Sequence, residues 1–156
     1  MDTPAEMLLA WQRLSKRYAR MELEVCAKHG LTRLETDILL FLANNPGYDT
    51  ARDIVAVRMI AKSHVSASVG DHRDLHSFPT RRSSDLVETL LAKGLIACAP
   101  DAQDKRRMHL RILPAAEAII TDAQAMQRAF LERLLRGLSD ADCAELKRLL
   151  LHVSKN

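Results

Sequence analysis

The sequence predicts a mainly α-helical chain with one small β-hairpin, in the order α-α-α-α-β-β-α-α. Long stretches at both ends repeat apolar residues every three or four positions, as amphipathic helices do. Two short strand-like segments follow Gly94 and are joined by a polar loop rich in Asp and Arg. The excess positive charge lies between the two long stretches. These observations indicate a small basic module carried between long helical arms.

The first helix is expected from about Pro4 to Ala27, and Gly30 is the residue type that ends helices in a left-handed conformation. Thr32 and Glu35 have the spacing of a capping box, so a second helix should begin there and run to about Ala43. The apolar stripe of the first helix contains Leu8, Trp11, Leu14, Tyr18, Met21 and Val25. The second helix should bury Leu34, Ile38, Leu39 and Leu42.

A turn is expected at residues 44–47, after which Thr50 can cap a short third helix, Ala51 to Val57. A fourth helix should begin near Ala61 and bury Val65 and Val69. The strands are expected at Leu95 to Ala99 and Met108 to Leu113.

Pro114 should end the hairpin and open a long fifth helix, about Ala115 to Arg136, which Gly137 stops. Ser139 should then cap a last helix, Asp140 to about Val153. The apolar face of the fifth helix contains Ile119, Ile120, Ala123, Met126, Phe130 and Leu134. A small module cannot cover such long stripes. We therefore expect residues 1–156 to form one domain in which arms 1–30 and 115–156 pack on each other and on a second copy.

Composition narrows the function. Only 4% of the 156 residues are aromatic, which argues against binding nucleic acid by stacking bases. No apolar run approaches the roughly 18 residues of a membrane span, and no signal peptide is recognisable, so we expect a cytoplasmic protein without a membrane partner. The three cysteines match no zinc or disulfide spacing, which favours buried or idle thiols, with a peroxide sensor at Cys26 as the alternative.

The distribution of charge favours a nucleic-acid binder, and the motifs give no sign of an enzyme. Outside 70–86, residues 50–111 contain eight basic and four acidic side chains, the footprint of a duplex binder or, in the plainer interpretation, a solvated face. We find no glycine-rich phosphate loop, no metal-ligand spacing and no nucleophile elbow. The sequence therefore predicts no enzyme, no cofactor and no metal site.

Four segments together resemble the MarR (multiple antibiotic resistance regulator) family: residues 62–69, 91–96, 101–106 and 110–115. The most specific is the pattern Asp101, Asp104, Arg106 ahead of a strand. The resemblance implies a winged helix-turn-helix module over residues 31–114 with helical dimerisation arms. It also implies a homodimeric, ligand-responsive repressor that binds a palindromic operator in double-stranded DNA and responds to a small aromatic or anionic effector.

The resemblance further assigns the contacts to DNA. The recognition helix would present Lys62 to a phosphate and would present three short polar side chains to bases or phosphates, namely Ser63, His64 and Ser66. At the wing, Arg106 would enter the minor groove, Lys105 and Arg107 would contact phosphates, and Asp104 would pair with Arg106 or cap the loop. The alternatives are cap and turn chemistry for Ser63, His64 and Ser66 and a solvated loop for the wing.

A block from Gly70 to Leu86 interrupts this pattern and resembles the in-frame translation of a common short-read sequencing adapter. Removing Val69 to Leu86 restores an uninterrupted family pattern, and Pro79 breaks helices. We interpret 70–86 as a foreign insert whose histidines and arginines carry no function, with Asp71 to Ser84 as an exposed excursion. The alternative function is a helical dimerisation protein without DNA affinity, because the insert breaks the recognition helix.

Overall fold

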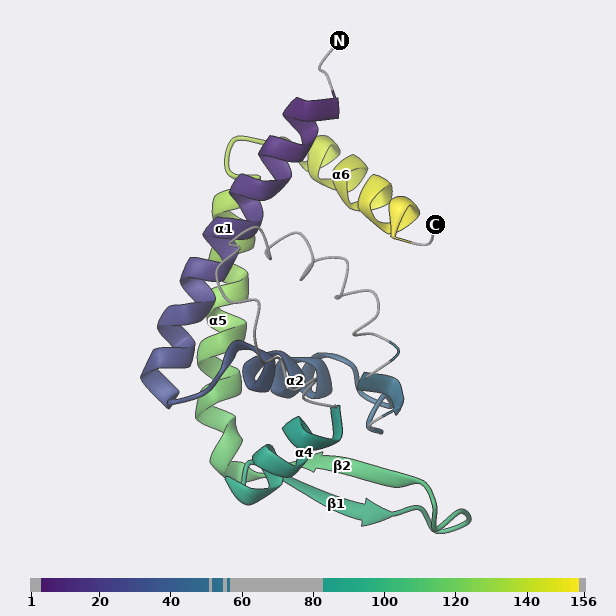
Figure 1. Cartoon of the computed structure of the whole chain (residues 1–156). Helices are drawn as coiled ribbons and strands as arrows, with labels where there is room; N and C mark the ends of the chain where they lie inside the picture. Colours follow the sequence, from purple (N-terminus) through teal and green to yellow (C-terminus); the bar gives the residue numbers. More distant parts are fainter. Residues whose placement is uncertain (1–3, 51, 55, 57–82, 155–156) are drawn as a thin grey trace.

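A computed structural model describes residues 4–50, 52–54, 56 and 83–154. Two long helices, α1 (Pro4–His29) and α5 (Glu117–Leu135), lie side by side and run in opposite directions, and α6 (Asp140–Val153) lies near the end of the arm where α1 begins (Figure 1). The long helices expected at both ends of the chain are therefore present. None of the helices in the described ranges is long and apolar enough to cross a bilayer.

The other end of the molecule contains α2 (Arg33–Asn44), α4 (Ser83–Ala92) and a two-stranded sheet (Figure 1). Strands β1 (Ile96–Pro100) and β2 (Met108–Ile112) pair antiparallel, with Ile96 opposite Ile112 and Pro100 opposite Met108. The strands start or end one residue away from the expected limits. A 3-10 turn, η1 (Pro114–Ala116), precedes α5, because the Ala116 N–H donates to the Leu113 carbonyl three residues back.

Local capping chemistry fixes where the helices begin. Thr32 and Glu35 form the predicted capping box, in which each backbone N–H donates to the other side chain. Ser139 opens α6 in the same way, together with Asp142. Gly30, which follows α1, has φ 65°, a conformation that glycine adopts without steric cost. Thr50 exchanges the same pair of bonds with Asp53, and residues 52–54 and 56 are helical, as expected for the third helix.

The main core joins α2, α4, the sheet and the start of α5. Leu39, Leu90 and Ile96 are essentially inaccessible to solvent, and Leu110 of β2 closes the cluster from the side of the wing. A second cluster lies between α1, α2 and α5 and contains Val25, Leu40, Ala123 and Met126. As expected, Leu90 and Leu95 are buried, and Leu91 packs against the core. The sheet is thus anchored by side chains and not only by its own hydrogen bonds.

The end of the 70–86 block is part of the fold, which corrects one expectation. We expected an exposed excursion that included Ser83 and Ser84, but both are helical residues of α4. Leu86 is 2% exposed and lies in the core one turn before Leu90. The expectation treated the block as one polar unit, whereas a leucine spaced four residues from another buried leucine continues an apolar stripe. Residues 70–82 lie outside the described residues.

Candidate nucleic-acid interface

The β1–β2 hairpin extends away from the helices as a wing (Figure 1). Leu110 lies in the core, whereas Met108, two residues earlier on the same face of β2, is exposed. The Leu110 N–H donates to the Asp49 carbonyl at 2.7 Å, and Thr50 and His109 form an isolated bridge. The base of the wing is therefore attached to the start of the third helix.

Two aspartates fold the loop at the wing tip. The Asp101 carboxylate accepts from the backbone N–H groups of Gln103 and Asp104, at 2.7 and 2.9 Å. The Asp104 carboxylate accepts from the Arg106 N–H at 3.0 Å, and the Asp104 carbonyl accepts from the Arg107 N–H. The Asp101 N–H closes the loop by donating to the Arg107 carbonyl at 2.8 Å. Asp104 thus binds the backbone of Arg106, an arrangement that caps the loop.

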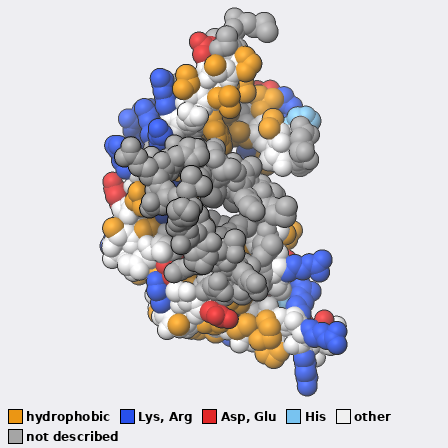
Figure 2. Space-filling view, in the orientation of Figure 1, with side chains coloured by type: hydrophobic (Ala, Val, Ile, Leu, Met, Phe, Trp, Pro, Cys, Tyr) orange, Lys and Arg blue, Asp and Glu red, His pale blue; other side chains and the backbone are white. Residues whose placement is uncertain are grey.

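The three basic side chains of the wing, Lys105, Arg106 and Arg107, are all exposed. Within the described ranges none of them forms an ion pair with a carboxylate. Figure 2 shows Lys and Arg side chains gathered at the far end of the hairpin. Hydrogen bonds from Thr50 hold the pKa of Asp53 below its usual value, and the charge of Arg107 adds to this effect. The loop therefore presents three exposed cations, without an ion pair among the described residues, on a backbone that its own aspartates bind.

His109 joins the wing to the body, a contact that sequence reasoning missed. Its Nδ1 lies 2.7 Å from Asp49 Oδ1, and its Nε2 lies 2.9 Å from Asp101 Oδ2. Hydrogen bonds to Asp101 and Asp49 raise the pKa of His109, and the bond to His109 holds the pKa of Asp101 far below its usual range. In the sequence, the only sign of this contact is a histidine between Met108 and Leu110 on the expected strand. Its partner Asp49 is 60 residues away, so the sequence does not identify the pair.

Lys93 belongs to the body of the module. Its Nζ lies 2.8 Å from Oε1 of Glu35, whose side chain is 3% exposed. Burial works against the charged form of Glu35, but hydrogen bonds from Lys93 and Thr32 outweigh it, so the pKa of Glu35 lies below its usual value. Lys93 therefore stabilises the junction between α4 and the capping box of α2.

The expected recognition-helix residues Lys62, Ser63, His64 and Ser66 lie outside the described residues. The structure places the elements that precede and follow them in the sequence. Thr50 and Asp53 begin the third helix beside the wing base, and α4 packs against β1 through the core. The wing residues Asp104, Lys105, Arg106 and Arg107 are described and lie together in one loop.

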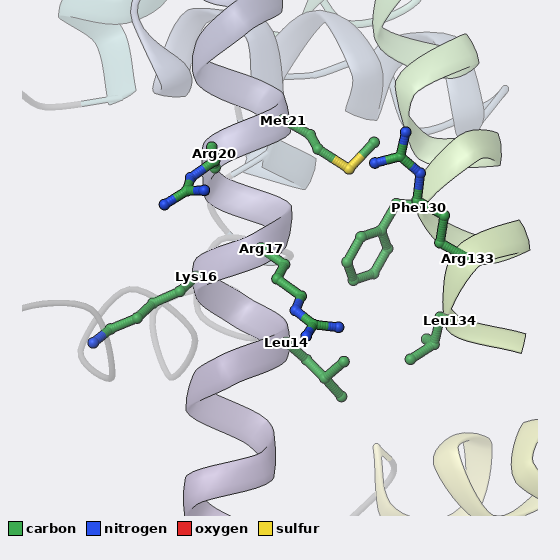
Figure 3. Close-up of a pocket in the computed structure, with 8 residues that line it drawn as sticks. All are labelled: Leu14, Lys16, Arg17, Arg20, Met21, Phe130, Arg133 and Leu134. Carbon is green, nitrogen blue, oxygen red and sulfur yellow. The ribbon is translucent and has the colours of Figure 1, made fainter.

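A cavity of about 560 Å³ lies between α1 and α5. Figure 3 shows Arg17 and Arg133 pointing into the space between the two helices, whereas Lys16 and Arg20 point away from it. The apolar part of its lining consists of Leu14, Met21, Phe130 and Leu134. An apolar wall with two inward arginines suits a small molecule that has an aromatic body and a negative group.

Cys26, the thiol considered as a peroxide sensor, lies in a buried position. Cys26 is 4% exposed, and its Sγ lies 3.4 Å from Thr36 Oγ1. A peroxide-sensing thiol needs access and a basic neighbour, so this burial argues against the sensor alternative. The described residues contain no cluster of three or more His, Cys, Asp or Glu that could hold a metal ion.

Comparison with known proteins agrees with this architecture. Residues 29–73 match the model of the MarR family. The chain has the winged helix fold of MarR-type regulators. A mutant of MepR from a multidrug-resistant S. aureus clinical isolate superposes with a TM-score of 0.68 at 19% identity, covering 98% of this chain and 96% of that one.

Two further solved structures share the fold. The transcription regulator MarR from Oenococcus oeni PSU-1 gives a TM-score of 0.60 at 17% identity, covering 99% and 100% of the two chains. A complex of S. aureus MepR with DNA gives 0.52 at 20% identity, covering 92% and 93%. No curated protein sequence matches this chain.

Proposed function

We propose that this chain is a MarR-type transcriptional regulator that binds double-stranded DNA as a homodimer. The observation that carries the proposal is the wing loop, in which three exposed cations sit on a backbone fixed by Asp101 and Asp104. Such a loop suits insertion of Arg106 into a narrow minor groove, with Lys105 and Arg107 on the flanking phosphates. The match of residues 29–73 to the MarR family, and the MepR–DNA complex of the same fold, support it.

The second candidate is a helical dimerisation protein without DNA affinity. The observation that favours it is the position of residues 70–86, which follow the expected recognition-helix residues and end within the first turn of α4. Extra residues at that point would interrupt the helix expected to present Lys62, Ser63, His64 and Ser66. This candidate and the first share the arms and differ only in the DNA-reading surface.

Selection from a pool of random duplexes separates the two candidates. It should be run in parallel on the full chain and on a chain that lacks residues 68–85. Enrichment of one pseudo-palindromic sequence by the shortened chain is expected if it is a dimeric regulator, because two-fold symmetric proteins read symmetric half-sites. If neither chain enriches a sequence, the dimerisation protein is the better description.

The dimer proposal rests on apolar side chains that the arms leave in solvent. Helix α6, all of whose residues are described, has no buried residue. The exposed large apolar side chains of the arms are Met7, Leu8, Leu9, Trp11, Leu23, Leu131, Leu138, Leu149, Leu150, Leu151 and Val153. Monomeric proteins rarely expose so many apolar residues along one end, so a second copy is the expected cover.

Replacing Leu150 with Lys should therefore weaken the dimer. Leu150 is 54% exposed in the single chain, and burying an ammonium group in an apolar interface is unfavourable. We expect the dimer dissociation constant to rise at least about tenfold, measured by sedimentation equilibrium. Ala92→Lys, at an exposed site at the end of α4, is the matched control and should leave it unchanged. A wild-type chain that sediments as a stable monomer at micromolar concentration would refute the dimer.

Ligand response is proposed for the cavity between α1 and α5. Arg17 and Arg133 come from different helices, so a negative group between them would fix the spacing of α1 and α5. Helices α1 and α5 are part of the arms, and α5 is joined to strand β2 of the wing by η1. A ligand that fixes the spacing of α1 and α5 can therefore alter the distance between the two DNA-binding modules of a dimer.

A substituted benzoate series is a suitable probe for this site. We expect Arg17→Ala and Arg133→Ala each to weaken benzoate binding about tenfold to one hundredfold, the usual effect of removing a hydrogen bond to a charged group. The control is Arg128→Ala, because Arg128 is exposed on α5 and does not line the cavity. Calorimetry checks this, and equal affinities for the three variants would remove the arginines from the site.

A further inference from the structure

Both ring nitrogens of His109 face carboxylate oxygens, which accept hydrogen bonds. Nδ1 lies 2.7 Å from Asp49 and Nε2 lies 2.9 Å from Asp101. A neutral imidazole has one N–H and one lone pair, so it can satisfy only one of two carboxylates. The arrangement requires the imidazolium, which donates to both.

The two carboxylates belong to different parts of the module. Asp49 immediately precedes Thr50, the residue that caps the third helix through Asp53. Asp101 begins the wing loop, and its other carboxylate oxygen accepts from Gln103 and Asp104. One imidazolium therefore connects the entrance of the third helix to the residue that folds the wing tip.

We propose that His109 is a positioning residue, which holds the wing loop in its DNA-binding shape by bridging Asp49 and Asp101. Its consequence for DNA affinity rests on the proposed function, whereas its effect on the loop does not. Around the ring, Asp49 comes from the segment before the third helix and Asp101 from the loop after β1. Two arginines lie two positions to either side of His109: Arg107 just before β2 and Arg111 on it. The charge of Arg107 also acts on Asp53.

The direction of the pH effect follows from the shift of His109. Its pKa is raised in the folded chain by the bonds to Asp101 and Asp49. The bridge therefore contributes fully below the ordinary histidine pKa of about 6.5 and is lost as pH rises through the raised value. The pKa of Asp101 is held far below this range by its bond to His109, so the loss comes from the histidine. We expect the wing to loosen, and duplex affinity to fall, as the solution becomes alkaline.

The test is backbone ¹⁵N relaxation of the full chain at pH 5.5 and pH 9, read at Gln103, Asp104, Arg106 and Arg107. In the wild type, order parameters should drop from about 0.85 at the lower pH to below about 0.6 at the higher. His109→Gln should give the lower values at both pH values. His152→Gln, on exposed α6, is the control and should behave as wild type.

A second variant keeps the proposal testable if His109→Gln folds poorly. Asp49→Asn leaves Asp101 bonded to His109 but removes one negative charge, so the His109 ring should titrate at lower pH than in wild type. Ordered wing amides at both pH values in wild type and His109→Gln would overturn the proposal. Duplex affinity is measured separately. If the wing loosens at high pH but the chain binds no duplex, the proposed DNA-binding function is wrong and the positioning role of His109 still holds.

Discussion

Removing residues 68–85 should raise the affinity for a specific operator at least about 1,000-fold over that of the full chain. The deletion takes out 18 residues, or five helical turns at 3.6 residues per turn, so the two sides should rejoin in phase. It joins Ala67 to Leu86 and keeps the side chain that the core uses. The full chain should bind only at the non-specific level, with dissociation constants of about 10⁻⁴ to 10⁻⁶ M. Fluorescence anisotropy with the selected duplex measures the difference.

A second deletion of the same length is the matched control. Deleting residues 69–86 restores the same helical phase but leaves Ser68 at the position that Leu86 occupies in the core. Both shortened chains should bind the operator. The chain that keeps Leu86 should unfold with a free energy about 2–5 kcal/mol larger, the range for large-to-small changes in cores. Denaturant titration checks this. Tight, sequence-specific binding by the full chain would contradict the interpretation of 70–86 as an insert.

Arg106→Ala, made in the shortened chain, should weaken operator binding by about 1–3 kcal/mol, a factor of roughly 5 to 150. The loss should be largest for operators with A·T pairs beneath the wing, where the minor groove is narrow and most negative. Folding stability should change little, because Arg106 is exposed and its backbone N–H still bonds Asp104. Competition binding with A·T-flanked and G·C-flanked duplexes measures the effect.

Lys93→Ala should do the opposite of Arg106→Ala: it should lower folding stability and change operator affinity little. It removes the ion pair of Glu35, whose carboxylate is nearly inaccessible to solvent. We expect a stability loss of about 1–3 kcal/mol, because Thr32 still donates to that carboxylate. Operator affinity of the folded fraction should change less than in Arg106→Ala. Equal affinities for the two variants would remove the wing from the proposed interface.

Features that depend on residues close in sequence were predictable. The capping box at Thr32, the cap at Ser139 and the helix-ending glycines Gly30 and Gly137 follow from the chemistry of three or four neighbouring residues. The order of elements followed from apolar periodicity, because a repeat of three to four residues indicates a helix and an alternating repeat indicates a strand. The hairpin loop was predicted from the polar run between two strand-like segments, and its role as a wing came from the family resemblance; only the structure shows which atoms the aspartates bind.

Features that depend on distant residues were not predictable in this way. The bridge from His109 to Asp49 spans 60 positions, and nothing local marks either residue as a partner. The same holds for Glu22 on α1, which is fully buried and bonds Arg33 of α2 at 2.6 Å. The burial of Leu86 was missed for another reason: the composition of the whole block was polar, but a single leucine in phase with Leu90 was enough to enter the core.

The salt dependence of operator binding by the chain that lacks residues 68–85 tests the central claim most directly. Each phosphate neutralised by a Lys or Arg contributes about −0.9 to the slope of log affinity against log salt concentration. If the basic wings and recognition helices of a dimer grip the duplex, the slope should be steep and should become shallower in Arg106→Ala. A shortened chain that folds and dimerises but shows a slope near zero, or no binding at low salt, would contradict the claim.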